Sequence, residues 1–374
     1  SPFGGTAYVT VRDADVLSVV SMESNTQTAD IPVGDGPQGV VVSADGARAY
    51  VANSIDNTIS VINTSTRGVV ATIALPGAPG RLALAPRGER LYATLAQQDR
   101  LVAISTRTLA VEASAPVGAD PSSVAVTRDG SSALVTNRGD NTVAVVELMG
   151  MTVTQTLAVG ADPVGIIADP LVGVLALTPP AMYVANRGSN TISKLEPDVI
   201  GWRLTDTIPV PGNPMGMALS ADHRYLYVTQ SALGQVAVVR LGSSAISNTV
   251  PVGTMPVSVA VALGGSRALV ADLGSGTGTV ISLAPRVEPV RAVRVRGTSA
   301  IARARVTTDS EGAWEIRCSW SESPVSSITM LYTNMGSTAP AQPASVSAGQ
   351  SATVDCPLND LRRGQTYSYA FRAE

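Results

Sequence analysis

The stretch that decides the fold is Val117–Val146, which reads VGADPSSVAVTRDGSSALVTNRGDNTVAVV. Its opening letters, VGADP, recur unchanged at Val159–Pro163. Its LVTN segment is matched by YVAN at Tyr50 and again at Tyr183. A chain that repeats itself in this way predicts a repeat architecture, in which each copy is one supersecondary unit.

Two independent markers show that the repeat has a nearly constant period. The residues that open the YV-x-N-like boxes follow one another at intervals of 42, 42, 42, 49, 44 and 42, and they are Tyr8, Tyr50, Tyr92, Leu134, Tyr183, Tyr227 and Leu269. The prolines that end the VGxxP-like turns keep a similar spacing, and they are Pro37, Pro79, Pro121, Pro163, Pro214 and Pro256. The longest interval contains an insertion at Leu171–Ala181. Seven boxes predict seven copies.

Each copy carries signals for four short strands. An alternating apolar run such as Ser123–Thr127 precedes a DG turn, and the box strand, a strand such as Asn141–Val145 and a fourth strand ending in VG follow. Short strands separated by Gly, Asn, Asp and Pro pair antiparallel. Four such strands in each copy form one blade of a β-propeller. The sequence therefore predicts an all-β protein, with a seven-bladed β-propeller followed by a small β-sandwich.

Two of the boxes also carry a resemblance to a known family. YVANSIDNTISVIN (Tyr50–Asn63) and YVANRGSNTISKL (Tyr183–Leu195) resemble the YVTN-repeat family of seven-bladed β-propellers. The resemblance covers residues 1–297 and implies the fold, but not a function, because propellers carry many unrelated functions. The boxes at Tyr92, Tyr227 and Leu269 lack the asparagine, so this residue is not needed in every blade.

The closure of the ring leaves two assignments open for one segment. Blade 1 starts almost at its Tyr8 strand, so its inner strand must come from elsewhere in the chain. Aligning the copies makes Pro289–Gly297 the outer strand of blade 7 and places residues 300–306 (AIARARV) in register for the missing strand of blade 1. The same segment could instead be the first strand of the next domain.

Residues 298–374 form the predicted second domain, because the period ends there. Strands are expected at Ala313–Trp320, Ser327–Asn334, Ser351–Leu358 and Thr366–Ala373. LRRGQTY (Leu361–Tyr367) resembles the tyrosine corner of fibronectin type III domains, which implies an immunoglobulin-like sandwich that lacks its last strand. The strand of Tyr367, Tyr369 and Phe371 is then an open edge, and we expect another chain or the N-terminal SPFGG to cover it.

The two cysteines, Cys318 and Cys356, both fall on the core face of predicted strands. A disulfide would indicate an oxidising compartment. Two buried free thiols would act as small apolar residues. The sequence leaves both alternatives open.

Composition argues against several classes of function. The net charge of −3 and a charged fraction of 15% do not suit a nucleic-acid binder, no apolar run is long enough for a membrane helix, and no signal peptide is visible. The single histidine, His223, occupies the glycine position of a DG-type turn and is expected to be exposed. We therefore expect no catalytic residues, no metal site and no cofactor.

Two groups of polar residues are candidates for binding. Asp35, Asp120 and Asp162 lie in the turns before the inner strands, where they could line the channel mouth, although aspartate is also ordinary turn chemistry. Blades 3, 6 and 7 lack it. A basic run comprises Arg291, Arg294, Arg296, Arg303 and Arg305. It would form a contact patch for an acidic partner, a glycan or phosphate. The alternative is that these side chains are simply solvated.

These observations favour a non-enzymatic structural or adhesion protein. We expect it on the exterior of a virus particle or a cell envelope, where it contacts other structural proteins of a larger assembly or a surface glycan. The alternative is a secreted or periplasmic lactonase-like propeller enzyme with a metal or ligand at the channel mouth. A periplasmic binding module that uses Trp202 for stacking is a third reading.

Overall fold

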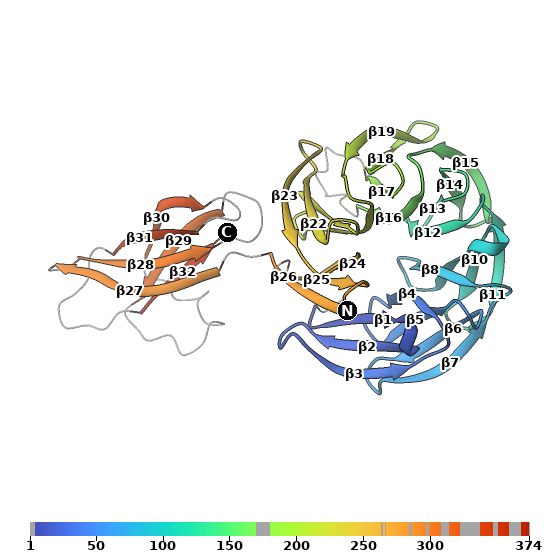
Figure 1. The fold of residues 1–374 in the computed structure, drawn as a ribbon, viewed down its shortest axis with the longest axis horizontal. Helices are drawn as coiled ribbons and strands as arrows, with labels where there is room; N and C mark the ends of the chain where they lie inside the picture. The colour runs from blue at the N-terminus through green and yellow to red at the C-terminus, as the bar shows by residue number, and fades with distance from the viewer. Residues whose placement is uncertain are drawn as a thin grey trace. The chain divides into compact units, whose positions relative to one another are not determined.

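The computed structural model describes residues 4–169, 180–262, 265 and 267–283, and from residue 286 onward the backbone of six strands. The chain divides into two compact units, Ser1–Val280 and Ile281–Glu374. The first unit is a seven-bladed β-propeller, in which seven small antiparallel sheets surround a central channel (Figure 1). The predicted all-β propeller fold is therefore confirmed.

Blades 1 to 4 follow one another along the chain, each running from the channel outward. Blade 1 contains β1 (Thr6–Val11), β2 (Val16–Ser21) and β3 (Thr26–Pro32). Blade 2 contains β4 (Pro37–Val42), β5 (Arg48–Asn53), β6 (Thr58–Asn63) and β7 (Gly68–Ala74). Blade 3 contains β8 (Pro79–Leu84), β9 (Arg90–Leu95), β10 (Arg100–Ser105) and β11 (Val111–Pro116). Blade 4 contains β12 (Pro121–Val126), β13 (Ser132–Asn137), β14 (Thr142–Glu147) and β15 (Thr152–Ala158).

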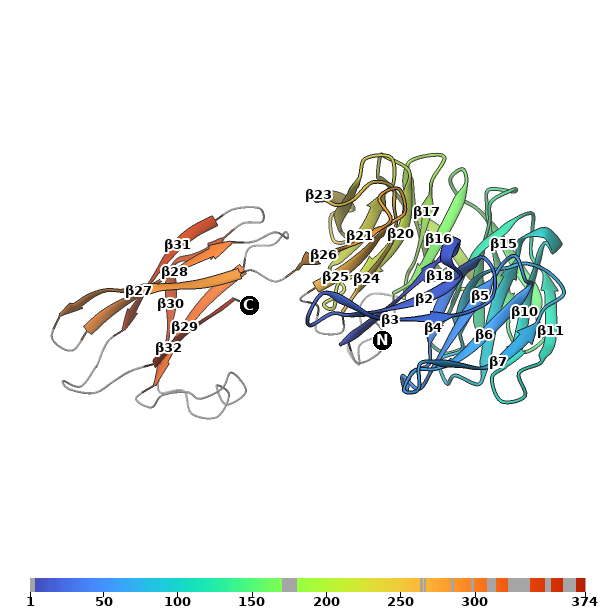
Figure 2. The same cartoon turned by 60° about the horizontal axis from the view of Figure 1, so that its bottom comes forward.

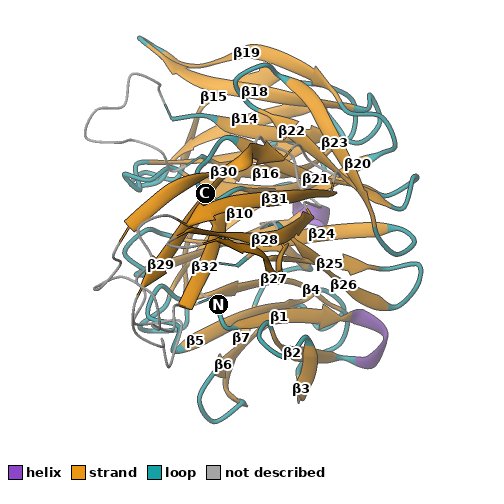
Figure 3. Ribbon diagram, turned by 90° about the vertical axis from the view of Figure 1, so that its left-hand side faces the viewer, coloured by secondary structure: helices purple, strands orange, loops and turns teal. Residues whose placement is uncertain are grey.

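Blades 5 to 7 complete the ring. Blade 5 contains β16 (Pro163–Ala168), β17 (Met182–Asn186), β18 (Thr191–Asp198) and β19 (Gly201–Pro209). Blade 6 contains β20 (Pro214–Leu219), β21 (Tyr225–Gln230), β22 (Gln235–Arg240) and β23 (Ala245–Pro251). Blade 7 contains β24 (Pro256–Val261), β25 (Arg267–Asp272) and β26 (Thr277–Ser282). Among the described residues the helical segments are two single turns of 3-10 helix, η1 (Arg12–Ala14) and η2 (Ala96–Gln98) (Figure 3).

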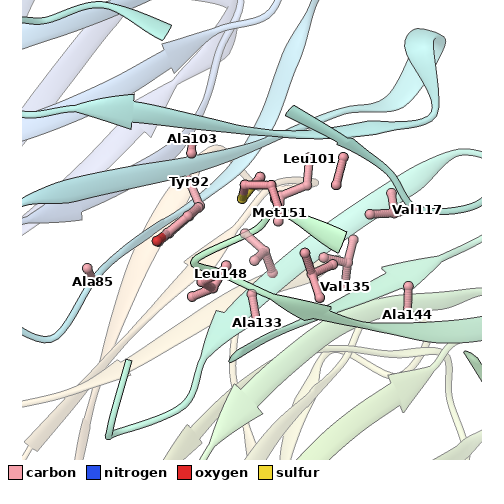
Figure 4. Packing of buried hydrophobic residues seen from close by; sticks show 13 residues of the cluster. Ala85, Tyr92, Leu101, Ala103, Val117, Ala133, Val135, Ala144, Leu148 and Met151 are labelled. Carbon is pink, nitrogen blue, oxygen red and sulfur yellow. The ribbon is translucent and has the colours of Figure 1, made fainter. Parts of the chain in front are cut away.

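The apolar core consists of the interfaces between neighbouring blades, which stand face to face around the ring (Figure 2). Side chains alternate between the two faces of a strand, and in a middle strand both faces are buried. In β13, Val135 packs with residues of blade 3, including Leu101 (Figure 4), whereas the adjacent Leu134 packs with Val184 of blade 5. Each such side chain stabilises the fold by roughly 1.5–3 kcal/mol.

The turns repeat as closely as the strands do. The hairpin that follows the box strand has a residue with positive φ in all seven blades, and these residues are Asp15, Asn57, Asp99, Asn141, Asn190, Gly234 and Gly276. The side chains of Asp15, Asp99, Asn141 and Asn190 also accept hydrogen bonds of 2.8–2.9 Å from backbone N–H groups in the turn that opens the next blade. The Asp and Asn residues that mark turns in the sequence therefore also connect neighbouring blades.

Ring closure differs from the sequence prediction. Blades 1 and 7 are three-stranded within the described residues. The guanidinium of Arg267 in blade 7 donates hydrogen bonds to the backbone oxygen of Met22 at 2.6 Å and to Oδ1 of Asn25 at 3.2 Å. A side chain thus joins the last blade to the first.

The second unit contains one six-stranded sheet in the order β27-β28-β31-β30-β29-β32. Its strands are β27 (Arg286–Arg296), β28 (Ser299–Thr307), β29 (Trp314–Ser321), β30 (Ser337–Val346), β31 (Ser351–Leu358) and β32 (Ser368–Ala373). The segments predicted for the outer strand of blade 7 and the inner strand of blade 1 instead form β27 and β28, because β28 pairs with β27 on one side and β31 on the other. This differs from the predicted boundary at residue 297.

Other predictions for the second unit stay predictions. The predicted strand at 327–334 and the tyrosine corner at 361–367 lie outside the described residues. β30, a Pro-containing strand, was not predicted. The resemblance to fibronectin type III domains is therefore not confirmed. The YVTN-repeat label of the first unit is not confirmed either.

Candidate functional site

One cavity lies beside β1, at the channel side of blade 1. It has a volume of about 340 Å³ and is lined by β1, β4 of blade 2, and β24 and β25 of blade 7, with Arg81 reaching in from blade 3. Blades 2 to 6 each have a strand inside their box strand, whereas in blade 1 the box strand β1 is the innermost strand of its sheet. The cavity borders β1 directly, because the described part of blade 1 has no strand inside β1.

A second cavity, of about 150 Å³, is formed by the inner strands of five blades. Its lining combines Arg81 and Ser123 with short segments of β16, β20 and β24. Arg81, Val257 and Ser258 line both cavities. The two cavities are thus neighbouring parts of the central channel, and these three residues lie where they meet.

Of the described residues that line these two cavities, Arg81 alone carries a charged side chain. Its side chain is accessible to solvent. The surrounding protein nevertheless removes part of its solvation and lowers the pKa of its guanidinium below the ordinary value. Its backbone N–H donates to Oγ1 of Thr94 at 3.2 Å, while its side chain makes no hydrogen bond or ion pair with another described residue.

Sequence analysis missed Arg81, although the repeat contained a signal for it. Arg81 lies two residues after the turn proline, and the other blades with this proline carry Gly39, Ser123, Gly165, Gly216 and Ser258 at that position. Because the other five residues are small, the blade fold does not require a long side chain at the position of Arg81.

Glycine at this position allows the inner strands to approach one another closely. A Cβ atom on Gly216 would lie 2.6 Å from the Cα atom of Ser258, and one on Gly165 would lie 2.7 Å from the backbone oxygen of Met215. Real Cβ contacts are not this short, so a larger residue would push the strands apart. The narrow packing of inner strands keeps the residues that line the channel close together.

The aspartates predicted at the channel mouth do not form one ring. Arg138 Nε donates to Oδ1 of Asp162 at 2.9 Å, Arg187 Nε donates to its other oxygen, and Arg138 also lies 3.7 Å from Asp120. Burial raises the pKa of Asp162, but the hydrogen bonds and charges of the two arginines outweigh it and hold that pKa below its ordinary value. Asp35 is not part of this ion-pair chain, so the three carboxylates are not assembled as one site.

The sequence predicted His223 to be an exposed turn residue, but the structure shows that it also has a partner. It has a φ of 57°, which fits the glycine position of the turn. Its Nδ1 atom lies 2.8 Å from Oδ1 of Asp169 in the preceding blade, and its side chain is only 19% exposed. The pair connects blades 5 and 6.

Trp202 packs against the apolar cluster between blades 4 and 5, and its backbone exchanges hydrogen bonds with the side chain of Gln155 at 2.7 and 2.8 Å. This places it in a packing role. Within the described residues, no three His, Cys, Asp or Glu side chains lie close enough to hold a metal ion. No helix in that part of the chain is long and apolar enough to cross a membrane.

The remaining sequence candidates lie where side chains are not described. Cys318 and Cys356 lie on β29 and β31, and β32, which carries Tyr369 and Phe371, is the last strand in the sheet order. Tyr367 itself is outside the described residues. The basic run lies on the paired strands β27 and β28, where Arg303 faces Val290 and Arg294 faces Ile301 across the ladder.

Comparisons with known proteins agree with the fold. The family model "Lactonase, 7-bladed beta-propeller" matches residues 11–165, which run from the end of β1 to the start of β16. No curated protein sequence matches the chain.

Solved structures with a similar fold are distant in sequence. Hydrazine synthase from Kuenenia stuttgartiensis is 18% identical with a TM-score of 0.63, and the match covers 75% of this chain and 93% of that one. A functionally unknown protein from Desulfotomaculum acetoxidans is 16% identical with a TM-score of 0.66, covering 75% and 92%. The Cps50 (Swd1) propeller domain from Myceliophteria thermophila is 10% identical with a TM-score of 0.61, covering 75% and 97%.

The expectation of a protein without enzymatic activity is contradicted by these comparisons. The matching family model is that of an enzyme family. The prediction relied on the absence of familiar catalytic motifs, and such an absence does not exclude an enzyme.

Proposed function

We propose that the protein is a lactonase-like hydrolase that binds a small cyclic ester in the 340 Å³ cavity beside β1. The observation that carries this proposal is the position of that cavity within a propeller whose first four blades match the lactonase family model. A volume of this size suits a small-molecule substrate. The virion and adhesion hypothesis has no comparable observation behind it.

Besides the Arg81 guanidinium, the lining offers neutral hydrogen-bonding groups on a mostly apolar surface. Thr6, Tyr8, Thr10, Gln38 and Ser258 contribute hydroxyl and amide groups, and valine, alanine and leucine side chains form most of the rest. Thr10 Oγ1 donates to the backbone oxygen of Gln38 at 2.8 Å, and Gln38 Nε2 donates to Ser54 Oγ at 2.9 Å, so those two groups are held in place. The Ser258 hydroxyl makes no hydrogen bond to another described residue and is free to contact a substrate.

This lining suits an ester that is already reactive. Among its described residues there is no Asp, Glu or His that could act as a general base. Hydrolysis there would depend on holding a strained ester in an orientation open to water, with hydrogen-bond donors stabilising the negative charge that develops on the carbonyl oxygen.

The test fills the cavity without disturbing the core. Ala260 lines the cavity and is exposed, so Ala260→Trp should block it while the protein remains folded. Ala245→Trp, on the exposed outer strand of blade 6, is the matched control. We expect the unmodified protein and A245W to hydrolyse a γ- or δ-lactone, and A260W to lose at least about tenfold in kcat/KM because substrate is excluded. Hydrolysis at the uncatalysed rate, or full activity in A260W, would overturn the proposal.

A further inference from the structure

We propose that Arg81 forms an anion-binding site in the central channel, which takes a small oxyanion such as phosphate or a carboxylate group. The site is defined by the junction of the two cavities, where Arg81 lies with Val257 and Ser258. It goes beyond the proposed hydrolysis and does not depend on it, because binding of an anion requires no reaction.

The first argument is electrostatic. The Arg81 guanidinium is accessible to solvent, so an anion can reach it, and a charged group in a cavity is stabilised by an opposite charge or by hydrogen-bond acceptors. Arg138 and Arg187, by contrast, both pair with the carboxylate of Asp162. Arg81 has no such partner among the described residues, and the cavity linings contain no described carboxylate. An anion from solution would supply the missing charge.

The second argument comes from the repeat. Glycine or serine occupies the position of Arg81 in the five other blades that carry the turn proline, so the fold does not need a long side chain there. The small residues in the other blades also leave the channel open. Ser123, Gly165 and Gly216 line the same 150 Å³ cavity as Arg81, and this space is large enough for one small anion.

The third argument concerns the other groups at the junction. Ser258 has a hydroxyl that no described residue engages, and it lines both cavities together with Arg81. A planar guanidinium can donate two parallel hydrogen bonds to a phosphate or a carboxylate, and a hydroxyl can donate a further one. The chemistry of the junction therefore selects oxyanions over neutral ligands and cations.

The experiment measures binding of inorganic phosphate and of succinate to the whole chain by titration calorimetry at low ionic strength. We expect one anion to bind per chain, and Arg81→Ser to weaken its affinity at least about tenfold, as loss of a charged hydrogen-bond donor does. Arg81→Lys should retain part of the affinity, because it keeps the charge but loses the planar fork. Arg87→Ser, at an exposed turn of the same blade, is the control and should bind as the unmodified protein does.

Serine already stands at the equivalent position in blades 4 and 7, so R81S is expected to fold, and its unfolding transition is measured alongside. The proposal is overturned if neither anion binds the unmodified protein, or if R81S binds as tightly as R87S does. Anion binding without lactone hydrolysis would retain this site and reject the hydrolase. Lactone hydrolysis without anion binding would do the reverse.

Discussion

Blades 1 and 7 share the sequence repeat of blades 2 to 6 but differ from them in the number of strands. The five middle blades have four strands, whereas the first and last have three within the described residues. Around the middle blades, neighbours are joined by apolar faces and by recurring side-chain hydrogen bonds to turns. Between blade 7 and blade 1, Arg267 makes the connection and a cavity remains beside β1. The repeat therefore determines each blade, while the exceptions to the repeat create the closure and the candidate site.

The largest expected effect comes from widening the packing of the inner strands between blades 6 and 7. Gly216→Ala places a Cβ atom 2.6 Å from the Cα atom of Ser258, on backbone that cannot rotate away. We expect a loss of about 2–3 kcal/mol in the free energy of unfolding, measured by urea denaturation. Gly242→Ala, where no atom lies within 4 Å of the added Cβ, is the control. Equal denaturation midpoints for the two variants would show that close strand approach is not required.

Removing the side-chain closure should have the next largest effect. Arg267→Ala deletes the hydrogen bonds to Met22 and Asn25 and should lower the free energy of unfolding by about 2 kcal/mol. The loss should be local, so amide hydrogen exchange should accelerate in β1 to β3 more than in the four-stranded blades. Arg224→Ala, whose side chain is 80% exposed, should leave exchange unchanged. An equal acceleration in all blades would contradict a role for Arg267 in closure.

The smallest expected effect lies within the four-stranded blades and depends on pH. Asp162→Asn removes the carboxylate that Arg138 and Arg187 share. We expect it to lower the free energy of unfolding at pH 7 by about 1 kcal/mol. Because the pKa of Asp162 in the folded protein lies below its ordinary value, its contribution is complete above about pH 4 and is lost as the pH falls through the folded pKa.

The measurement is the free energy of unfolding of D162N and the unmodified protein between pH 7 and pH 2.5. Their difference should shrink towards the acid end, and Asp13→Asn, an exposed aspartate, should show no such trend. A difference that stays constant with pH would mean that the ion pairs do not stabilise the folded state.

The sequence by itself determined the blades. Strand alternation, turn residues and the period of the Tyr50-type boxes are properties of short segments, and neighbouring segments in the chain are also neighbours in each sheet. For the same reason the hairpin positions with positive φ, such as Asn57 and Asn141, follow the Asn and Asp signals of the sequence. Local physics was sufficient for these features.

Only the tertiary structure decided how the ring closes and where a ligand could bind. Arg267 and Met22 lie 245 residues apart, and no pattern within one copy relates them. The sequence left two assignments open for residues 300–306, and in the structure this segment lies in β28, which pairs with β31. The cavity junction at Arg81 combines inner strands that are far apart in the chain, so its unpaired charge is visible only once these strands surround one channel.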